Sequence, residues 1–275
     1  MSQSPRNEAP AGRPLVVVER RGPIAVLRID RPAVHNALNG QVLAELDRAV
    51  AALPADGLRA AVLTGTGTRA FSAGADLDEL AGLSAEQAHE VLSTGQAVVS
   101  RIERSPVPVI AAVNGLALGG GFELVLACTF PVLAEGAQLG LPEAGLGLMP
   151  GYGGTQRLAR RVGAPVAAHS MLTGERIRAD RAFALGLTPV APVPVESVVD
   201  AACDLARSIA ARGPRAVRAV LLALRHGADV PLEAGLAFES ALAGLVTGGE
   251  EAAEGIAAFK ARRKPSFDVT QGEQE

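Results

Sequence analysis

The chain has 275 residues, a formal net charge of −3, a hydrophobic fraction of 48% and only 3% aromatic residues, with no tryptophan. This length suits one domain, or one domain with an appended helical lobe, whose core must be built from Ala, Val, Leu and Ile. The charge balance offers no electrostatic footprint for nucleic acid or for an anionic membrane surface, so these classes of partner are excluded.

The two cysteines, Cys128 and Cys203, lie far apart in apolar surroundings. We interpret them as buried thiols in a reducing compartment and expect a cytoplasmic protein, because neither a disulfide framework nor a zinc-binding spacing is available. No metal site is predicted, since the histidines are scattered without metal-ligand spacing. These histidines are His35, His89, His169 and His226.

Two segments have to be considered as a secretory signal or a membrane span. Residues 1–14 are polar, contain three prolines and lack an apolar region, which predicts a disordered tail and not a secretory signal. Residues 106–134 are almost continuously apolar, long enough for a membrane span. The stretch also carries several helix breakers and Glu123, which make a poor spanning helix. A strand, a turn and a fully buried helix fit this segment better.

The predicted elements of the first part alternate between strands and helices. The first are a β-hairpin of residues 15–20 and 24–29, a helix over 40–53 capped by Asn39, and a strand at 59–64. A capping box of Ser84 and Gln87 opens a helix that ends at about Glu103. Next come a strand at 107–113, an apolar helix at 121–127, a short strand at 130–134 and a glycine-rich loop at 140–154.

After residue 190 the pattern becomes helical throughout. Strands alternating with helices, followed by helices alone, predict a layered α/β domain and then an α-helical lobe. We divide the chain into a tail of residues 1–14, a core domain of residues 15–195 and a C-terminal helical lobe of residues 196–275. The helices of the lobe are expected at about 196–211, 215–226, 231–246 and 250–263.

Glu123 is the most informative residue. It follows a triple glycine in an apolar segment, with no other charge within ten residues on either side. Burial should raise the pKa of this carboxyl group and prepare it for proton transfer. The glycines leave N–H groups free at the positive end of a helix, where a developing oxyanion can be held. A structural glutamate satisfied by a partner, beside glycines used for tight packing, remains the alternative.

Glu143 is the second candidate, among apolar and small residues at the mouth of the glycine-rich loop. Addition of water across a double bond needs such a pair, because one group polarises the water while a carboxyl delivers a proton to carbon. The small residues at 70–76 follow a strand and could bring a second backbone N–H to the same ligand. Taken singly, Glu143 is equally consistent with capping a turn, and Asp76 with an ordinary helix N-cap.

Together these segments resemble the enoyl-CoA hydratase/isomerase family, the crotonases, from about residue 15 to 267. The matching stretches are Asn36-Ala37-Leu38, residues 70–76, residues 108–123, Leu141-Pro142-Glu143, residues 153–158, Leu172-Thr173-Gly174 and residues 179–190, in the family's order. The resemblance implies an α/β fold, a crotonase-like spiral of ββα units with a C-terminal α-helical trimerisation lobe, and a homotrimer or a dimer of trimers.

The resemblance also implies roles for particular residues. It places an oxyanion hole at the backbone amides of Ala75 and Gly120, which would hold a thioester oxygen. Ala73 and Asp76 lie on the loop that lines the coenzyme A pocket in the family. The last implied contacts are Phe259 and Arg262, which match positions that reach the coenzyme A of a neighbouring subunit.

The presence of both glutamates favours syn-hydration of a 2-trans-enoyl-CoA, with Glu123 mainly on the water and Glu143 mainly the proton donor. Coenzyme A is then part of the substrate, and no separate cofactor is expected. A double-bond isomerase or a specialised acyl-CoA lyase is the alternative within the fold, and a non-catalytic acyl-CoA-binding oligomer is the alternative of another class. Two residues depart from the family pattern: Phe122, expected to narrow the acyl pocket, and Thr129, where an aspartate is common.

Overall fold

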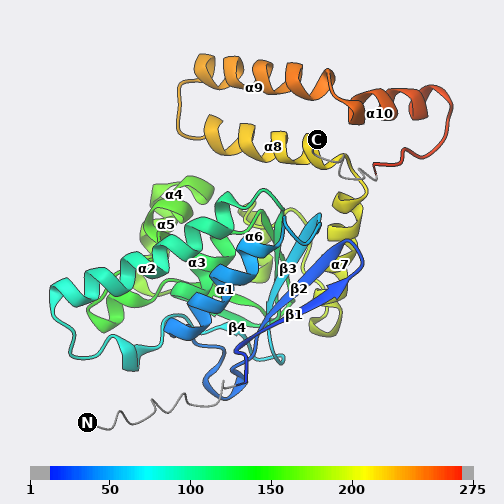
Figure 1. Ribbon diagram of the computed structural model, residues 1–275. Helices are drawn as coiled ribbons and strands as arrows, with labels where there is room; N and C mark the ends of the chain where they lie inside the picture. Colours follow the sequence, from blue (N-terminus) through cyan, green and yellow to red (C-terminus); the bar gives the residue numbers. More distant parts are fainter. Residues whose placement is uncertain (1–12, 268–275) are drawn as a thin grey trace, which may run out of the picture.

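Two sheets form the body of the molecule, of which the computed structural model describes residues 13–267 (Figure 1). The first sheet has the order β1-β2-β3-β5-β7 and the second the order β4-β6-β8-β9. The strands of the first are β1 (Val16–Arg21), β2 (Ile24–Ile29), β3 (Ala60–Gly65), β5 (Val109–Val113) and β7 (Phe130–Leu133). Those of the second are β4 (Ala70–Ser72), β6 (Leu116–Leu118), β8 (Gln138–Gly140) and β9 (Ile177–Arg178). The predicted tail of residues 1–14 lies outside the described residues, except for its last two.

After an initial hairpin in the first sheet, successive pairs of strands add one strand to each sheet. β1 and β2 form the predicted antiparallel hairpin, and β2, β3, β5 and β7 then pair in parallel. The pairs β3–β4, β5–β6 and β7–β8 repeat the same step, and a helix follows each pair. This order confirms the predicted α/β spiral of ββα units.

Helices cover the sheets and carry the predicted caps. The Asn39 side chain accepts a hydrogen bond from the Val42 amide at 3.0 Å, and Ser84 and Gln87 form the capping box. All eight residues of the helix that contains Glu123 are buried, as its apolar sequence predicts. No helix in the described part of the chain is long and apolar enough to cross a membrane. These helices are α1 (Gly40–Ala52), α2 (Ala85–Arg104), α3 (Gly120–Ala127), α4 (Gly154–Val162), α5 (Ala164–Thr173) and α6 (Ala179–Ala184).

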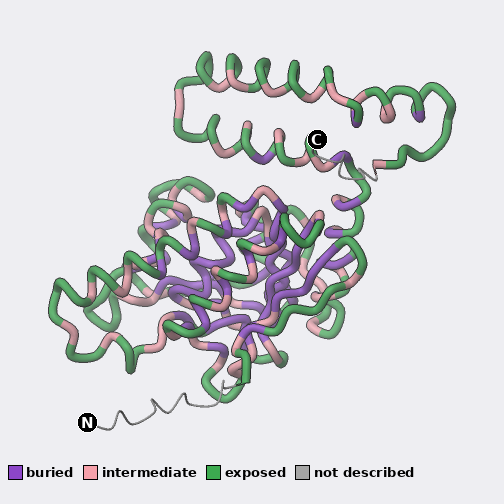
Figure 2. The backbone as a smooth tube through the Cα atoms, viewed as in Figure 1, coloured by how far each residue is buried: buried purple, intermediate pink, exposed green. Residues whose placement is uncertain are grey.

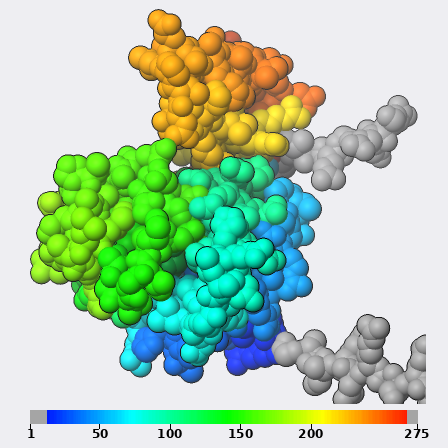
Figure 3. Space-filling view, turned by 90° about the vertical axis from the view of Figure 1, so that its left-hand side faces the viewer, coloured from blue at the N-terminus to red at the C-terminus, as the bar shows by residue number. Residues whose placement is uncertain are grey.

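The C-terminal helices divide into two groups. α7 (Val198–Ala210) packs on the first sheet and shares its core, so the helix that opens the predicted lobe of residues 196–275 joins the body. α8 (Pro214–Gly227), α9 (Leu232–Thr247) and α10 (Glu250–Lys260) form a separate group of helices that sits on top of the body (Figures 1 and 3). Arg225 of α8 contacts the body by donating to the Ser105 carbonyl at 2.9 Å. These three helices are mostly exposed or half-buried, whereas the buried residues gather in the body (Figure 2). Their exposed apolar side chains include Leu224, Leu232, Leu245 and Phe259.

Candidate active site

Glu123 lies in the first turn of α3 and is 1% exposed. Its Oε1 accepts hydrogen bonds from the backbone amides of Tyr152 at 2.8 Å and Gly154 at 2.6 Å. Burial raises the pKa of the Glu123 carboxyl group to about 7; the Gly154 amide opposes this rise, and the neighbouring Glu143 adds to it. The carboxyl group can therefore take up and release a proton near neutral pH.

The loop that holds Glu123 is itself fixed by Arg157 of α4. The Arg157 guanidinium donates to the Tyr152 carbonyl at 2.6 Å and forms an ion pair with Glu103 of α2 at 2.8 Å. A Cβ at Gly154 would lie 3.0 Å from both Cγ and Oε1 of Glu123, so the loop approaches the carboxyl group as closely as backbone can. Arg157 was singled out in the sequence only as part of a family motif, because its partner lies 54 residues away.

Glu143 is presented by the 3-10 segment Glu143–Leu146. Its Oε2 is buried and has no hydrogen-bond partner among the described residues, and burial raises the pKa of this carboxyl group. A Cβ at Gly119 would lie 3.0 Å from Glu143 Oε1, and Gly119 has a φ of +50°. The carboxyl group therefore lies against the start of α3, where only glycine fits easily.

The two carboxyl groups line one cavity of about 140 Å³. Their meeting is a tertiary effect, since Glu123 follows β6 and Glu143 follows β8, which are neighbours in the second sheet. Of the predicted site residues, this cavity brings together Ala73, Ala75, Gly120, Glu123 and Glu143. Its remaining walls are mostly apolar, with Leu77, Leu80, Leu92, Leu118, Pro142, Leu146, Leu148, Met149 and Tyr152.

The backbone amides of Ala75 and Gly120 make no hydrogen bond within the described residues. Leu38 pairs with the chain on both sides of Ala75, since its amide donates to Gly74 at 2.8 Å and its carbonyl accepts from Asp76 at 2.9 Å. A Cβ at Gly74 would lie 3.1 Å from the Gly120 nitrogen, so this loop approaches the start of α3. Two free donors thus border the same cavity as the carboxyl groups.

Three of the residues implied by the family resemblance do not line this cavity. Asp76 forms an ion pair with Arg31 at 3.0 Å, makes no capping hydrogen bond and lines a neighbouring hollow. Phe259, 85% exposed, and Arg262 lie at the end of α10 and at no described hollow.

Phe122, expected to narrow the acyl pocket, does not line the cavity either. Its side chain is fully buried in the core. The aromatic residue that does line the cavity is Tyr152, which the sequence did not single out as a site residue. Thr129 is the other residue that departs from the family pattern. Its hydroxyl accepts a hydrogen bond from the Val109 amide at 3.1 Å.

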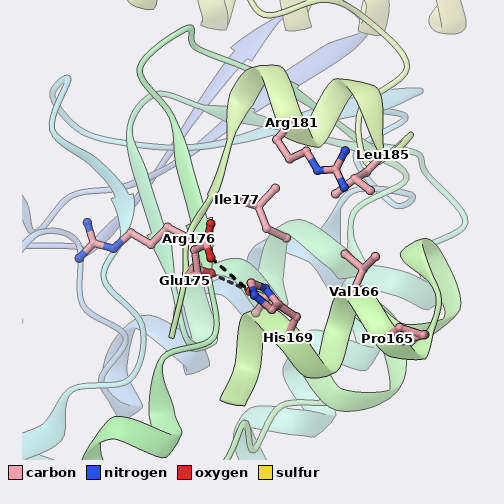
Figure 4. A pocket seen from close by; sticks show the side chains of 9 residues that line it. Pro165, Val166, His169, Glu175, Arg176, Ile177, Arg181 and Leu185 are labelled. Atoms are coloured by element: carbon pink, nitrogen blue, oxygen red, sulfur yellow. Dashed lines mark hydrogen bonds and ion pairs between the residues drawn. The ribbon is translucent and has the colours of Figure 1, made fainter. Parts of the chain in front are cut away.

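A larger hollow of about 360 Å³, bordered by α5 and α6, is a weaker candidate (Figure 4). Its polar lining includes an exposed pair, His169 Nε2 and Glu175 Oε2, 3.7 Å apart. It shares no residue with the cavity of Glu123 and contains no buried carboxyl group. No group of three or more potential metal ligands occurs among residues 13–267.

Comparison with known proteins agrees with this arrangement. The model of the family described as enoyl-CoA hydratase/isomerase matches residues 19–270. The chain is 40% identical over 253 residues to the crotonyl-CoA hydratase of Syntrophomonas wolfei, covering 92% of this chain and 97% of that one. It is 41% identical over 254 residues to the 2,3-dehydroadipyl-CoA hydratase of Escherichia coli, covering 92% and 98%. The crystal structure of an enoyl-CoA hydratase from Bacillus anthracis superimposes with a TM-score of 0.88 at 39% identity, covering 92% and 98%. The chain belongs to the enoyl-CoA hydratase/isomerase family.

Proposed function

We propose that the protein is an enoyl-CoA hydratase, a hydro-lyase that adds water across the 2,3 double bond of a 2-trans-enoyl-CoA to give a 3-hydroxyacyl-CoA. The observation that carries this proposal is the pair of buried carboxyl groups, Glu123 and Glu143, on one cavity that also presents two free backbone amides. Relatives at about 40% identity that are named as hydratases support it.

In this proposal the thioester oxygen accepts hydrogen bonds from the amides of Ala75 and Gly120. Addition at the β-carbon moves negative charge onto that oxygen, and donors aimed at it stabilise the enolate more than the substrate. Gly120 is the first residue of α3, whose dipole adds positive potential at the same place. Both donors belong to the backbone, so they are in position before the substrate arrives.

The surroundings of the two carboxyl groups suggest how they divide the work. Two amide hydrogen bonds favour the ionised form of Glu123, which then accepts the proton of the attacking water. Glu143 has a buried oxygen without a partner, which favours its neutral form. Protonated Glu143 delivers its proton to the α-carbon, so the water O–H bond breaks as the new C–O and C–H bonds form.

Binding of coenzyme A and assembly are part of the proposal. Ala73 and Asp76 border the coenzyme A pocket, and Phe259 and Arg262 reach the coenzyme A of a neighbouring subunit. The absence of Phe259 and Arg262 from this chain's own cavity supports a contact across subunits. A homotrimer or a dimer of trimers would cover the exposed apolar side chains of α8 to α10. We place the protein in the cytoplasm and in fatty-acid metabolism; its two buried, unpaired cysteines fit a reducing compartment.

Turnover of crotonyl-CoA by the full-length protein tests the activity. Hydration removes the ultraviolet absorbance of the conjugated thioester and yields a 3-hydroxyacyl product, which mass spectrometry identifies. The double variant Glu123→Gln/Glu143→Gln serves as the blank. Conversion of a 3-enoyl-CoA to the 2-enoyl form without hydration would assign the chain to isomerisation, and binding without turnover on any acyl-CoA would show a non-catalytic protein.

A further inference from the structure

The side chain of Tyr152 fills the space between α2 and α3. It is 2% exposed, and any Cβ at Gly95 of α2 would overlap its ring. On the other edge, a Cβ at Gly120 would lie 2.9 Å from Cε2 of the ring. Glycine on both helices therefore makes room for this one aromatic side chain.

The ring lies between two hollows. The catalytic cavity has a volume of about 140 Å³, and a side hollow bordered by α1 and α2 has about 230 Å³. Tyr152 lines both, together with Ala75 and Leu80, and is the largest of these three residues. The backbone amide of Tyr152 donates a hydrogen bond to Glu123, so the side chain of Tyr152 begins next to this carboxyl group. Burial, then the charges of Glu123 and Glu79, raise the pKa of the Tyr152 hydroxyl to about 12, which agrees with a carboxyl group near the ring in each hollow.

The walls of the side hollow indicate what would enter it if the ring were absent. Leu38, Leu43 and Val91 make part of the wall apolar, as an alkyl chain requires. The other lining groups include three acidic residues, Asp76, Glu79 and Glu90, and no basic one. Asp76 is paired with Arg31, but the carboxylates of Glu79 and Glu90 would repel a carboxylate at the end of an acyl chain.

We propose that Tyr152 is the residue that limits the acyl group of the substrate to a short chain, by closing the catalytic cavity against the side hollow, whose acidic lining would exclude a terminal carboxylate. The inference rests on the proposed hydratase activity and names the substrate class of that same site. The hydrogen bonds that Tyr152 makes with the described residues are those of its backbone amide and carbonyl, so the ring acts through its volume. A longer alkyl chain has to pass the place where the ring lies.

The test compares kcat/KM for crotonyl-CoA, 2-octenoyl-CoA and 2,3-dehydroadipyl-CoA on the full-length protein. The wild type should prefer crotonyl-CoA. Tyr152→Ala should raise the ratio of octenoyl to crotonyl turnover by about tenfold or more, since each accommodated methylene contributes a factor of this order. The ratio of kcat/KM for 2,3-dehydroadipyl-CoA to that for crotonyl-CoA should stay low in this variant. Tyr152→Phe, which keeps the ring, should keep the wild-type ratio.

A second pair of variants separates loss of the wall from loss of the fold. Tyr152→Leu removes the ring with a smaller loss of volume than Tyr152→Ala, and it should raise the ratio of octenoyl to crotonyl turnover as well. Circular dichroism shows whether each variant is folded. Adding Val91→Phe to Tyr152→Ala should refill the side hollow and restore the preference for crotonyl-CoA. A folded Tyr152→Ala or Tyr152→Leu protein with an unchanged ratio, or a wild type that prefers octenoyl-CoA, overturns the inference. Absence of hydration with every substrate overturns the proposed function instead.

Discussion

The two walls of the candidate catalytic cavity are built in different ways. On the Glu123 wall, the carboxyl group accepts two amide hydrogen bonds and the loop that donates them is fastened by Arg157. On the Glu143 wall, one carboxyl oxygen has no partner and the following residues expose large apolar side chains, with Met149 68% exposed. In the proposed mechanism the first wall is complete before the substrate arrives, and the second gains its remaining contacts from the substrate. Preorganisation is then concentrated on Glu123, the carboxyl group that the proposal requires to ionise.

The largest expected effect comes from removing either carboxyl group. Glu123→Gln and Glu143→Gln should each lower kcat for crotonyl-CoA by about 10²–10⁴, the usual contribution of a positioned proton-transfer group. The double variant should be little slower than either single one, because the pair acts as a unit. Loss of thioester absorbance measures all three. If the loss in kcat of the double variant equalled the product of the two single losses, the two carboxyl groups would serve separate steps.

The next effect is on stability and distinguishes Glu123 from an ordinary carboxylate. Its pKa is raised in the folded state from 4.5 to about 7, so the folded protein binds this proton more tightly than the unfolded chain does. The wild type therefore loses stability as the pH rises from about 4.5 to 7, by up to about 3 kcal/mol. Glu123→Gln cannot ionise, and its carbonyl can still accept both amides. Urea unfolding should find this variant more stable than the wild type at pH 8 and equal to it at pH 4; equal stability at both would contradict the raised pKa.

A smaller effect is expected from loosening the Glu123 wall. Arg157→Met removes the group that holds the Tyr152 carbonyl and should lower kcat between tenfold and a hundredfold, through misplacement of the carboxyl group. The acid limb of the pH profile should also move up, because weaker amide hydrogen bonds stabilise the carboxylate less. Arg160→Met is the matched control, since this exposed residue of the same helix binds Asp229 and Gln156 at the surface and makes no hydrogen bond to the Tyr152 loop. If Arg157→Met lowered kcat but did not shift the acid limb of the pH profile, the role of Arg157 would be structural only.

The smallest expected effect is the pH dependence of the wild type. In the proposed mechanism Glu123 is ionised when it accepts a proton from water, so kcat/KM should fall as the pH drops through about 7 and be about tenfold lower at pH 6. The apparent value belongs to the coupled pair, because Glu143 raises the pKa of Glu123. A profile that stays flat down to pH 5 would mean that Glu123 is an ordinary carboxylate and that the two walls do not differ in this respect.

The sequence by itself determined the features with a strong local signal. Asn39 and the capping box of Ser84 and Gln87 mark helix starts because a side chain can satisfy free amides only a few residues away. Burial of Glu123 followed from the apolar segment around it. The strands of two or three residues, β4, β6, β8 and β9, were not predicted as such, because so few residues show no periodicity. The helices α4 to α6 were not predicted either, and α4 begins at Gly154, the last residue of the predicted glycine-rich loop.

Only the tertiary structure decided which side chains share the site. In a helix buried at every position no polar face tells Glu123, which reaches the cavity, from Phe122, which turns into the core. The contact of Arg157 with Glu103 joins residues 54 positions apart, and the ring of Tyr152 packs between Gly95 of α2 and Gly120 of α3. Such pairings depend on how the sheets and helices stack, and local sequence carries no record of that stacking.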